Sequence, residues 1–161
     1  MYEGGIRVPG IARWPGKIRP GTTSEQPIIG SDFFATACAM AGIQVPQDRV
    51  IDGVDALGML TGADAPKRKV PLYWRLDMAP APFRMAMRKG DWKILASNDL
   101  GQFELYNLKE DPAESRDRVK EEPARFEAMK KELADLNARI EAEGPDWWKR
   151  LNPNGGGPSK K

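Results

Sequence analysis

The fold is decided by one stretch, residues 83–108, which reads FRMAMRKGDWKILASNDLGQFELYNL. In the run 83–88 Phe83, Met85 and Met87 alternate with Arg84, Ala86 and Arg88, which is the pattern of a half-buried β-strand; the short runs 92–96 and 103–108 are two further candidate strands. Between the first two runs, Lys89-Gly90-Asp91 is typical of a tight hairpin turn. Short connections between consecutive strands favour antiparallel pairing, so this stretch predicts a three-stranded meander.

The sequence on either side extends this sheet and covers it. Val70, Leu72 and Trp74 alternate with other residues in the same way and predict a fourth strand. After the meander, Pro123 suits the first turn of a helix. The apolar residues that follow it at spacings of three and four are Phe126, Met129, Leu133, Leu136 and Ile140. We therefore predict an α+β unit over 66–143, a four-stranded antiparallel sheet packed with a C-terminal amphipathic helix.

Residues 1 to about 30 are instead short segments between Pro-Gly and Gly-Gly turns. The apolar runs 6–8 and 11–14 predict two strands edged by those turns. Ser31 is expected to cap a short helix that ends at Gly42. Its many small residues lead us to expect a buried helix.

Two further segments lie outside these units. The polar stretch 63–69 reads as a linker. Residues 144–161 form a Gly-rich tail in which the Trp147-Trp148 pair is expected to pack on the body, ahead of a disordered end.

Composition excludes several classes of function. The chain has 161 residues, with 25 Lys and Arg against 23 Asp and Glu, so its balance does not favour a nucleic-acid partner. The absence of histidine excludes Ser-His-Asp catalysis, and a single cysteine excludes an internal disulfide and a thiolate metal cluster. The longest uncharged run, 33–47, is shorter than the ~20 residues of a membrane span. No signal-peptide pattern follows Met1, and we expect no membrane partner.

Several short motifs follow one another along residues 2 to about 150. They are YEGGIRVPG (2–10) followed by WPG (14–16), the helix SDFFAT…AG (31–42), the turn IDGVD (51–55) with LTG (60–62), RKGDWK (88–93), ELYNL (104–108) and DPAE (111–114). In this order and spacing they resemble the C-terminal portion of the type I, formylglycine-dependent sulfatases of the alkaline-phosphatase superfamily. The resemblance implies that 1–62 is the C-terminal end of the sulfatase α/β domain and 66–143 its C-terminal subdomain. It also implies a hydrolase acting on sulfuric esters.

The same resemblance implies catalytic groups that are not found in this sequence. Sulfatases of this kind form formylglycine from the Cys or Ser of a Cys/Ser-x-Pro-x-Arg motif, whereas Cys38 is followed by Ala39-Met40-Ala41 and has no Arg four positions on. They bind calcium through upstream Asp and Asn residues and use His and Lys around the sulfate. In the family, a sulfate-binding Lys precedes the residue that corresponds to Tyr2. In this sequence the position of that Lys would lie before Met1. We therefore expect no catalytic residue, metal ligand or cofactor in this chain.

The parent enzyme would then combine this chain with an N-terminal catalytic part that carries the calcium and the formylglycine. Its expected substrates are sulfated carbohydrates or aryl sulfates. The chain alone is expected to be inactive. The sequence does not indicate a compartment, although sulfatases of this kind are often exported or periplasmic.

Four residues are candidates for the wall of the substrate cleft. Tyr2, Glu3 and Arg7 lie closest in sequence to the implied sulfate-binding Lys, and Asp77 lies in the Pro-rich connection 76–82. Each has a structural alternative: an ion pair for Glu3 and Arg7, a packed ring with a bonded hydroxyl for Tyr2, and a stiff surface connection for 76–82.

Two other functions remain open on the sequence alone. One is a non-catalytic interaction or glycan-binding module, in which the Trp147-Trp148 pair would stack on a sugar ring. The other is a phosphatase or phosphonate hydrolase of the same superfamily.

Overall fold

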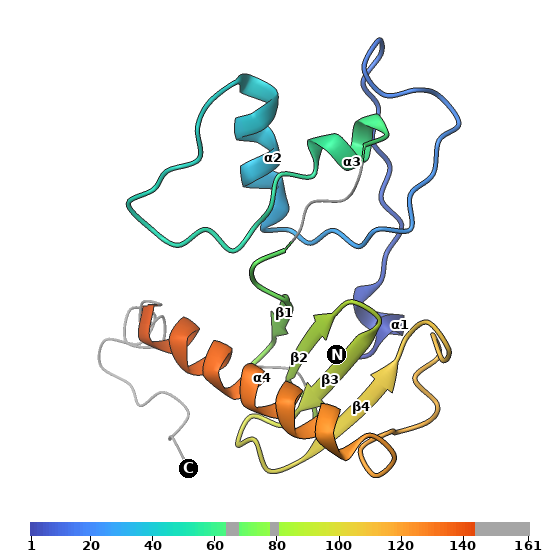
Figure 1. Ribbon diagram of the computed structural model, residues 1–161, viewed down its shortest axis with the longest axis vertical. Coiled ribbons are helices and arrows are strands. Elements are labelled where there is room, and N and C mark those ends of the chain that lie inside the picture. The colour runs from blue at the N-terminus through green and yellow to red at the C-terminus, as the bar shows by residue number, and fades with distance from the viewer. Residues whose placement is uncertain (64–67, 78–80, 144–161) are drawn as a thin grey trace.

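The computed structural model describes residues 1–63, 68–77 and 81–143. In chain order its elements are α1 (Glu3–Ile6), α2 (Asp32–Ala41), α3 (Leu57–Thr61), β1 (Leu72–Arg75), β2 (Met85–Lys89), β3 (Trp92–Ala96), β4 (Phe103–Asn107) and α4 (Pro123–Glu143). Figure 1 shows two parts: α2, α3 and long loops in one, and the sheet, α4 and α1 in the other. Residues 64–67 of the predicted linker 63–69 and the tail at 144–161 lie outside the described residues.

The sheet has the order β1-β2-β3-β4, and every neighbouring pair is antiparallel. This confirms the predicted four-stranded meander. The hairpin between β2 and β3 closes on Lys89 opposite Trp92, with Gly90 at a φ of 61°. Glycine adopts this left-handed conformation without the steric cost that a side chain would add.

One face of the sheet packs on α4, which confirms the predicted amphipathic helix. The helix begins at Pro123, where the missing backbone N–H costs no hydrogen bond. The buried side chains of this core are Met85, Met87, Ile94, Ala96 and Leu105 from the sheet and Met129, Leu133 and Leu136 from α4. Burying a side chain of this size contributes roughly 1.5–3 kcal/mol, so this layer is a principal source of stability.

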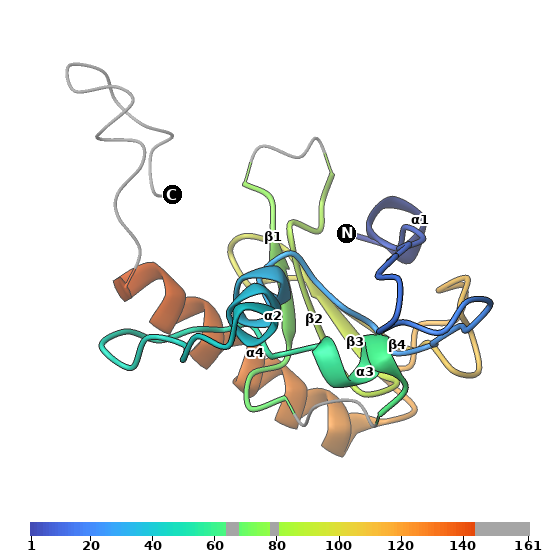
Figure 2. The same cartoon turned by 90° about the horizontal axis from the view of Figure 1, so that it is seen from above.

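The opposite face of the sheet is covered by the start of the chain. Its buried residues are Phe83, Ala86, Leu95, Tyr106 and Leu108, with Met1 and Trp74 packed against them. The ring of Tyr2 meets those of Phe83 and Tyr106 edge-on, each at 6.3 Å between centroids. Figure 2 shows α1 and α4 on opposite sides of the sheet. Residues from both ends of the described chain therefore enclose the strands.

The two strands predicted at 6–8 and 11–14 are wrong. Residues Glu3–Ile6 form a single helical turn, and none of the described residues from 7 to 31 lies in a strand. A strand needs a neighbour to satisfy its backbone groups, and Pro9 lacks the N–H to form such a ladder. Val8 and Ile11 are 77% and 97% exposed, so these apolar runs do not pack as strands would.

Helix α2 ends at Gly42 as predicted, with a φ of 68°. The expected cap at Ser31 is wrong in detail, because the Ser31 side chain makes no capping hydrogen bond. The helix is also less buried than expected: Phe33 is 67% exposed and Phe34 is 49% exposed. Only the side that meets residues 54–56 is covered, where the Ala56 N–H donates to Thr36 Oγ1 at 3.0 Å.

Among the described residues, no helix combines the length and the apolar character needed to cross a membrane.

Candidate functional site

Three of the short motifs, YEGGIRVPG, RKGDWK and DPAE, meet in one buried group of charges beneath the start of the chain. Lys93 is fully buried, and its Nζ donates to Glu3 Oε1 at 2.8 Å. The same Nζ lies 2.8 Å from Glu114 Oε1, an ion pair rather than an aligned hydrogen bond. Arg88 adds a second positive charge, 3.6 Å from Glu3 Oε2. We call Glu3, Arg88, Lys93 and Glu114 the motif cluster; its two acids and two bases balance, as buried charges require.

The alternation of β3 explains how a lysine reaches this position. Lys93 pairs in register with Arg88 of β2 and Tyr106 of β4, so its side chain is on the sheet face away from α4. Its neighbours Trp92 and Ile94 belong to the other face, where the Arg125 guanidinium lies 4.4 Å from the centroid of the Trp92 ring. The RKGDWK motif therefore contributes side chains to both faces of the sheet.

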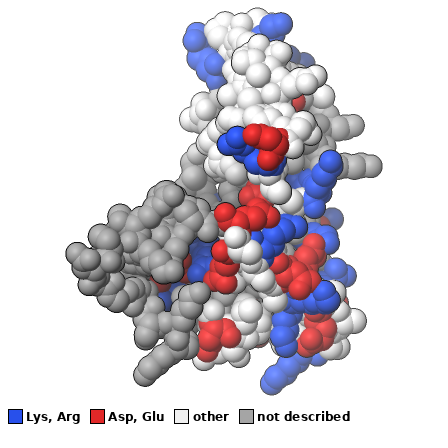
Figure 3. All heavy atoms as spheres, turned by 90° about the vertical axis from the view of Figure 1, so that its left-hand side faces the viewer, with Lys and Arg blue, Asp and Glu red and all other residues white. Residues whose placement is uncertain are grey.

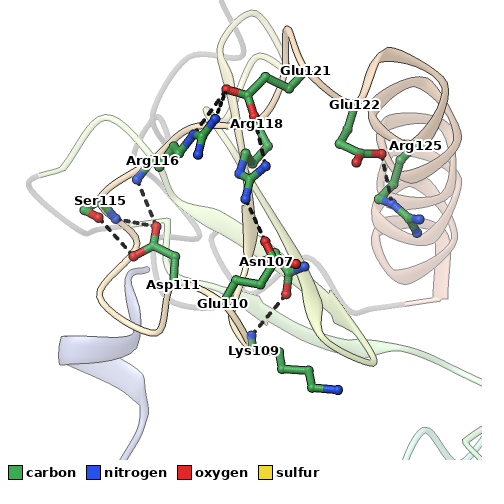
Figure 4. A network of polar contacts seen from close by, with 10 residues as sticks. All are labelled: Asn107, Lys109, Glu110, Asp111, Ser115, Arg116, Arg118, Glu121, Glu122 and Arg125. Atoms are coloured by element: carbon green, nitrogen blue, oxygen red, sulfur yellow. Dashed lines mark hydrogen bonds and ion pairs between the residues drawn. The ribbon is translucent and has the colours of Figure 1, made fainter.

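Glu114 is presented by the loop that joins β4 to α4. The Asp111 carboxylate accepts hydrogen bonds from the backbone N–H groups of Ser115 at 2.8 Å and Arg116 at 2.9 Å (Figure 4). These bonds, that from Arg116 first, hold the pKa of Asp111 below its usual range. Inside this turn Glu114 has a φ of 54°, a strained value for a residue other than glycine. Its Oε2 accepts the backbone N–H of Glu3.

Further ion pairs on this loop fix its course over the surface. Arg118 donates to Glu110 at 2.7 Å and to Glu121 at 2.9 Å, and Arg116 also donates to Glu121 (Figure 4). The backbone N–H of Arg118 donates to the carbonyl of Leu105, which ties the loop to the edge of β4. Exposed pairs of this kind contribute about 0–1 kcal/mol each, so their role is mainly to define geometry.

Glu104, an acid outside the motif cluster, binds the hydroxyl groups of two tyrosines. Its Oε2 accepts the hydroxyl of Tyr2 at 2.6 Å and that of Tyr106 at 2.9 Å. Desolvation, followed by the nearby Glu104 carboxylate, raises the pKa of Tyr2 to about 12. The same two causes raise the pKa of Tyr106. Both phenols therefore remain neutral donors at ordinary pH.

The four candidate cleft residues lie in three places. Tyr2 and Glu3 join the charges described above, whereas the exposed side chain of Arg7 follows the end of α1. Asp77 belongs to a separate group, in which its Oδ1 accepts a hydrogen bond from Arg75 Nε at 2.7 Å. That Arg75 also donates to Asn137 and Glu141 of α4. Contact of any of the four with a substrate stays a prediction.

Arg88, Lys93, Glu104 and Glu114 were not predicted as individual site residues from the sequence, although each belongs to one of the short motifs. A signal for Lys93 is present in the run 92–96, where it is the only charge among apolar residues. Such a charge on a strand that is apolar on both faces must find a buried partner.

A separate buried acid holds the part of the molecule that contains α2. The Asp32 carboxylate accepts two hydrogen bonds from Arg68 and one each from the N–H groups of Ile29 and Val54. Burial opposes ionisation here, but these bonds lower the pKa of Asp32 overall. The same region explains the glycine of the Asp52-Gly53 motif. A Cβ on Gly53 would lie 2.0 Å from the carbonyl oxygen of Ser31, so a larger residue would clash there.

A cleft of ≈ 630 Å³ runs between the two parts, along the tip of the β2–β3 hairpin. Its basic residues Arg68, Arg88 and Lys89 form ion pairs with Asp32, Glu3 and Glu132, respectively. In the space-filling view of one side of the molecule, acidic and basic side chains are likewise intermixed (Figure 3). Neither surface concentrates one sign of charge.

The described residues do not fit the metal that the sequence resemblance implies. Within 1–63, 68–77 and 81–143, no three His, Cys, Asp or Glu side chains come together as a metal site. Glu3 and Glu114 share the Lys93 ammonium, which lies 2.8 Å from each carboxylate and offsets their charge. The free Cys38 is half-buried on α2. We therefore derive no step of chemistry from calcium or a modified cysteine in this chain.

Comparisons with known proteins give the family. Residues 1–141 match the family model described as N-sulphoglucosamine sulphohydrolase, C-terminal. N-acetylgalactosamine-6-sulfatase of Canis lupus familiaris is 42% identical over 94 residues, which are 57% of this chain and 16% of that protein. N-acetylgalactosamine-6-O-sulfatase of Bacteroides thetaiotaomicron is 28% identical over 153 residues, 86% of this chain and 29% of that protein. Steryl-sulfatase of Rattus norvegicus is 52% identical over 61 residues, 38% of this chain and 11% of that protein.

Solved structures agree with these relatives. A protein in complex with its substrate, D-glucosamine-2-N,6-O-disulfate, has a TM-score of 0.59 at 28% identity, over 81% of this chain and 27% of the other. A putative sulfatase from Bacteroides thetaiotaomicron has a TM-score of 0.52 at 22% identity, over 73% of this chain and 25% of the other, and supports the fold. Each of these proteins is much longer than the part that the chain matches. The chain belongs to the N-sulphoglucosamine sulphohydrolase C-terminal family and is a sulfatase C-terminal portion.

Proposed function

We propose that this chain is the non-catalytic C-terminal portion of an enzyme that hydrolyses sulfate esters of carbohydrates. The observation that carries the proposal is the family match over residues 1–141. Carbohydrate rather than sterol is favoured because the relative that matches 86% of the chain is named for a sulfated amino sugar, whereas the steryl-sulfatase matches 38%.

In this proposal the chain supplies scaffold and one wall of the cleft. Covalent hydrolysis needs an activated nucleophile and groups that stabilise the charge it develops. The charges beneath the start of the chain are paired with one another, so they are suited to holding the backbone of residues 2–7 rather than to attacking a substrate. Calcium and formylglycine would come from upstream sequence. Tyr2, Glu3, Arg7 and Asp77 remain the proposed cleft residues.

An activity assay tests this proposal. The purified chain is incubated with an aryl sulfate and with D-glucosamine-2-N,6-O-disulfate, with and without added calcium, beside an active sulfatase as positive control. We expect no sulfate release above the rate in buffer. Saturable release in proportion to the concentration of the chain would overturn the proposal.

The exposed apolar side of α2 favours a second candidate, an interaction or glycan-binding module. Phe33, Phe34 and Met40 are 67%, 49% and 49% exposed on one short helix, and apolar groups in such number promote association. Size-exclusion chromatography and a glycan-binding screen separate the candidates. A monomer with saturable sugar affinity supports the module, whereas association without sugar binding supports the scaffold.

A further inference from the structure

We propose that the motif cluster is a latch: Lys93 and Glu114 are positioning residues that hold residues 1–7 on the sheet. The latch fixes the position of residues 1–7 on the sheet. The stability of the sheet and α4 comes instead from the core that they share. This inference concerns the chain itself and does not depend on the substrate proposed above.

The contacts that hold the segment are concentrated on two residues. Glu3 receives the Lys93 ammonium on its side chain and donates its backbone N–H to Glu114. Tyr2 donates its hydroxyl to Glu104. The three partners come from β3, from the loop after β4 and from β4, so three separate places on one face of the sheet converge on adjacent residues.

Burial makes these partners depend on one another. The side chains of Lys93, Glu114 and Glu3 are 0%, 2% and 8% exposed. A buried charge without its partner is strongly unfavourable, so withdrawal of Glu3 leaves Lys93 under-neutralised. Beyond the latch the chain has little hold, because Val8 and Ile11 are largely exposed. The buried charge contacts that fix the segment are therefore located at the motif cluster, beside the packing of Met1 and Tyr2 on the same face of the sheet.

The sheet has an independent source of stability. Its ladders run between β1, β2, β3 and β4 without any residue of 1–7, and its larger core is on the face that packs against α4. The strain at Glu114, with its φ of 54°, places its carboxylate against Glu3 rather than improving that core. A residue that served general stability would show the reverse: its loss would loosen segment and sheet alike.

Residue-resolved amide hydrogen exchange by NMR tests the latch on the 161-residue chain. The reporters in the segment are the N–H groups of Gly5 and Arg7, which bond the carbonyls of Tyr2 and Glu3. The reporters in the sheet are Met87 and Ile94, which pair across β2 and β3 in the core beneath α4. The variants are Lys93→Met and Glu3→Gln.

Each variant has a matched control that removes an exposed ion pair. Lys89→Met breaks the pair with Glu132 on the same hairpin, and Glu110→Gln breaks the pair with Arg118 on the loop that carries Glu114. In the latch variants we expect exchange at Gly5 and Arg7 to accelerate about tenfold or more, while Met87 and Ile94 change by less than about threefold. In the controls all four amides should stay within about twofold of the original chain.

Two results would overturn the proposal. One is unchanged protection of Gly5 and Arg7 in both latch variants. The other is an equal loss of protection in segment and sheet, which would make the cluster a general stabiliser. If Lys93→Met does not fold, Glu3→Gln decides, because it keeps the size and hydrogen-bonding capacity of the side chain and removes only its charge. Since no substrate is involved, failure here is distinct from failure of the activity assay.

Discussion

At the scale of single residues, Gly53 shows how a two-residue motif is set by contact distance. A Cβ at this position would approach the backbone of Ser31 to 2.0 Å, and backbone cannot move aside as a side-chain end does. We predict that Gly53→Ala lowers the free energy of unfolding by about 1–3 kcal/mol. Urea denaturation measures this change. Gly10→Ala is the control, with open space around it and an expected change within about 0.5 kcal/mol; equal effects would contradict the contact.

The tyrosines provide a prediction on pH. All three of them, Tyr2, Tyr73 and Tyr106, have raised pKa values, and desolvation is the first cause in each; those of Tyr2 and Tyr73 rise to about 12 from 10.0. Because folding favours the neutral phenol, its contribution to stability is complete below pH 10 and is lost as the pH rises through 12.

Ultraviolet absorbance of tyrosinate checks this expectation. The folded chain should show no ionisation step centred near pH 10, whereas the chain in urea should titrate there. A step near the ordinary value in the folded chain would show that these hydroxyls are not held as described.

At the scale of elements, α4 and the sheet depend on a few fully buried side chains. Leu133 is 0% exposed between α4 and the strands. We predict that Leu133→Ala costs about 2–5 kcal/mol in the free energy of unfolding, since it removes buried methyl groups and leaves a cavity. Lys131→Ala, two positions away with a side chain 77% exposed, should change this free energy by less than about 0.5 kcal/mol in the same urea titration. A small loss for Leu133 would contradict the packing of α4.

Elements with long, regular patterns were predictable from the sequence, and short ones were not. The stripe from Phe126 to Ile140 predicts α4, and the alternation in 70–75 and 83–88 with short connections to the next runs predicts the meander, because both are local patterns. The runs 6–8 and 11–14 are too short for a period to distinguish a strand from an extended loop. The burial of α2 was overestimated for a related reason, since apolar residues show what a helix is able to bury and not what covers it.

At the scale of the whole molecule, the contacts on the sheet face away from α4 could not be predicted from the sequence. The ion pair of Glu3 with Lys93 joins residues 90 apart in the chain, and the hydrogen bond from Glu3 to Glu114 spans 111. No local pattern contains such contacts. The motifs YEGG, RKGDWK, ELYNL and DPAE were visible as a set, but only the fold shows that they meet beneath the start of the chain. Assignment of Tyr2 and Glu3 to a cleft wall remains a prediction for the same reason.

The central claim is that these motifs build a buried scaffold, and a double-mutant cycle on Glu3 and Lys93 tests it most directly. Amide hydrogen exchange at Gly5 and Arg7 in the original chain, Glu3→Gln, Lys93→Met and the double variant gives their coupling free energy for the opening of residues 1–7. We predict about 1–3 kcal/mol, against about 0.5 kcal/mol or less for the exposed Lys89–Glu132 pair. Additivity of the Glu3 and Lys93 losses within about 0.3 kcal/mol would contradict the account.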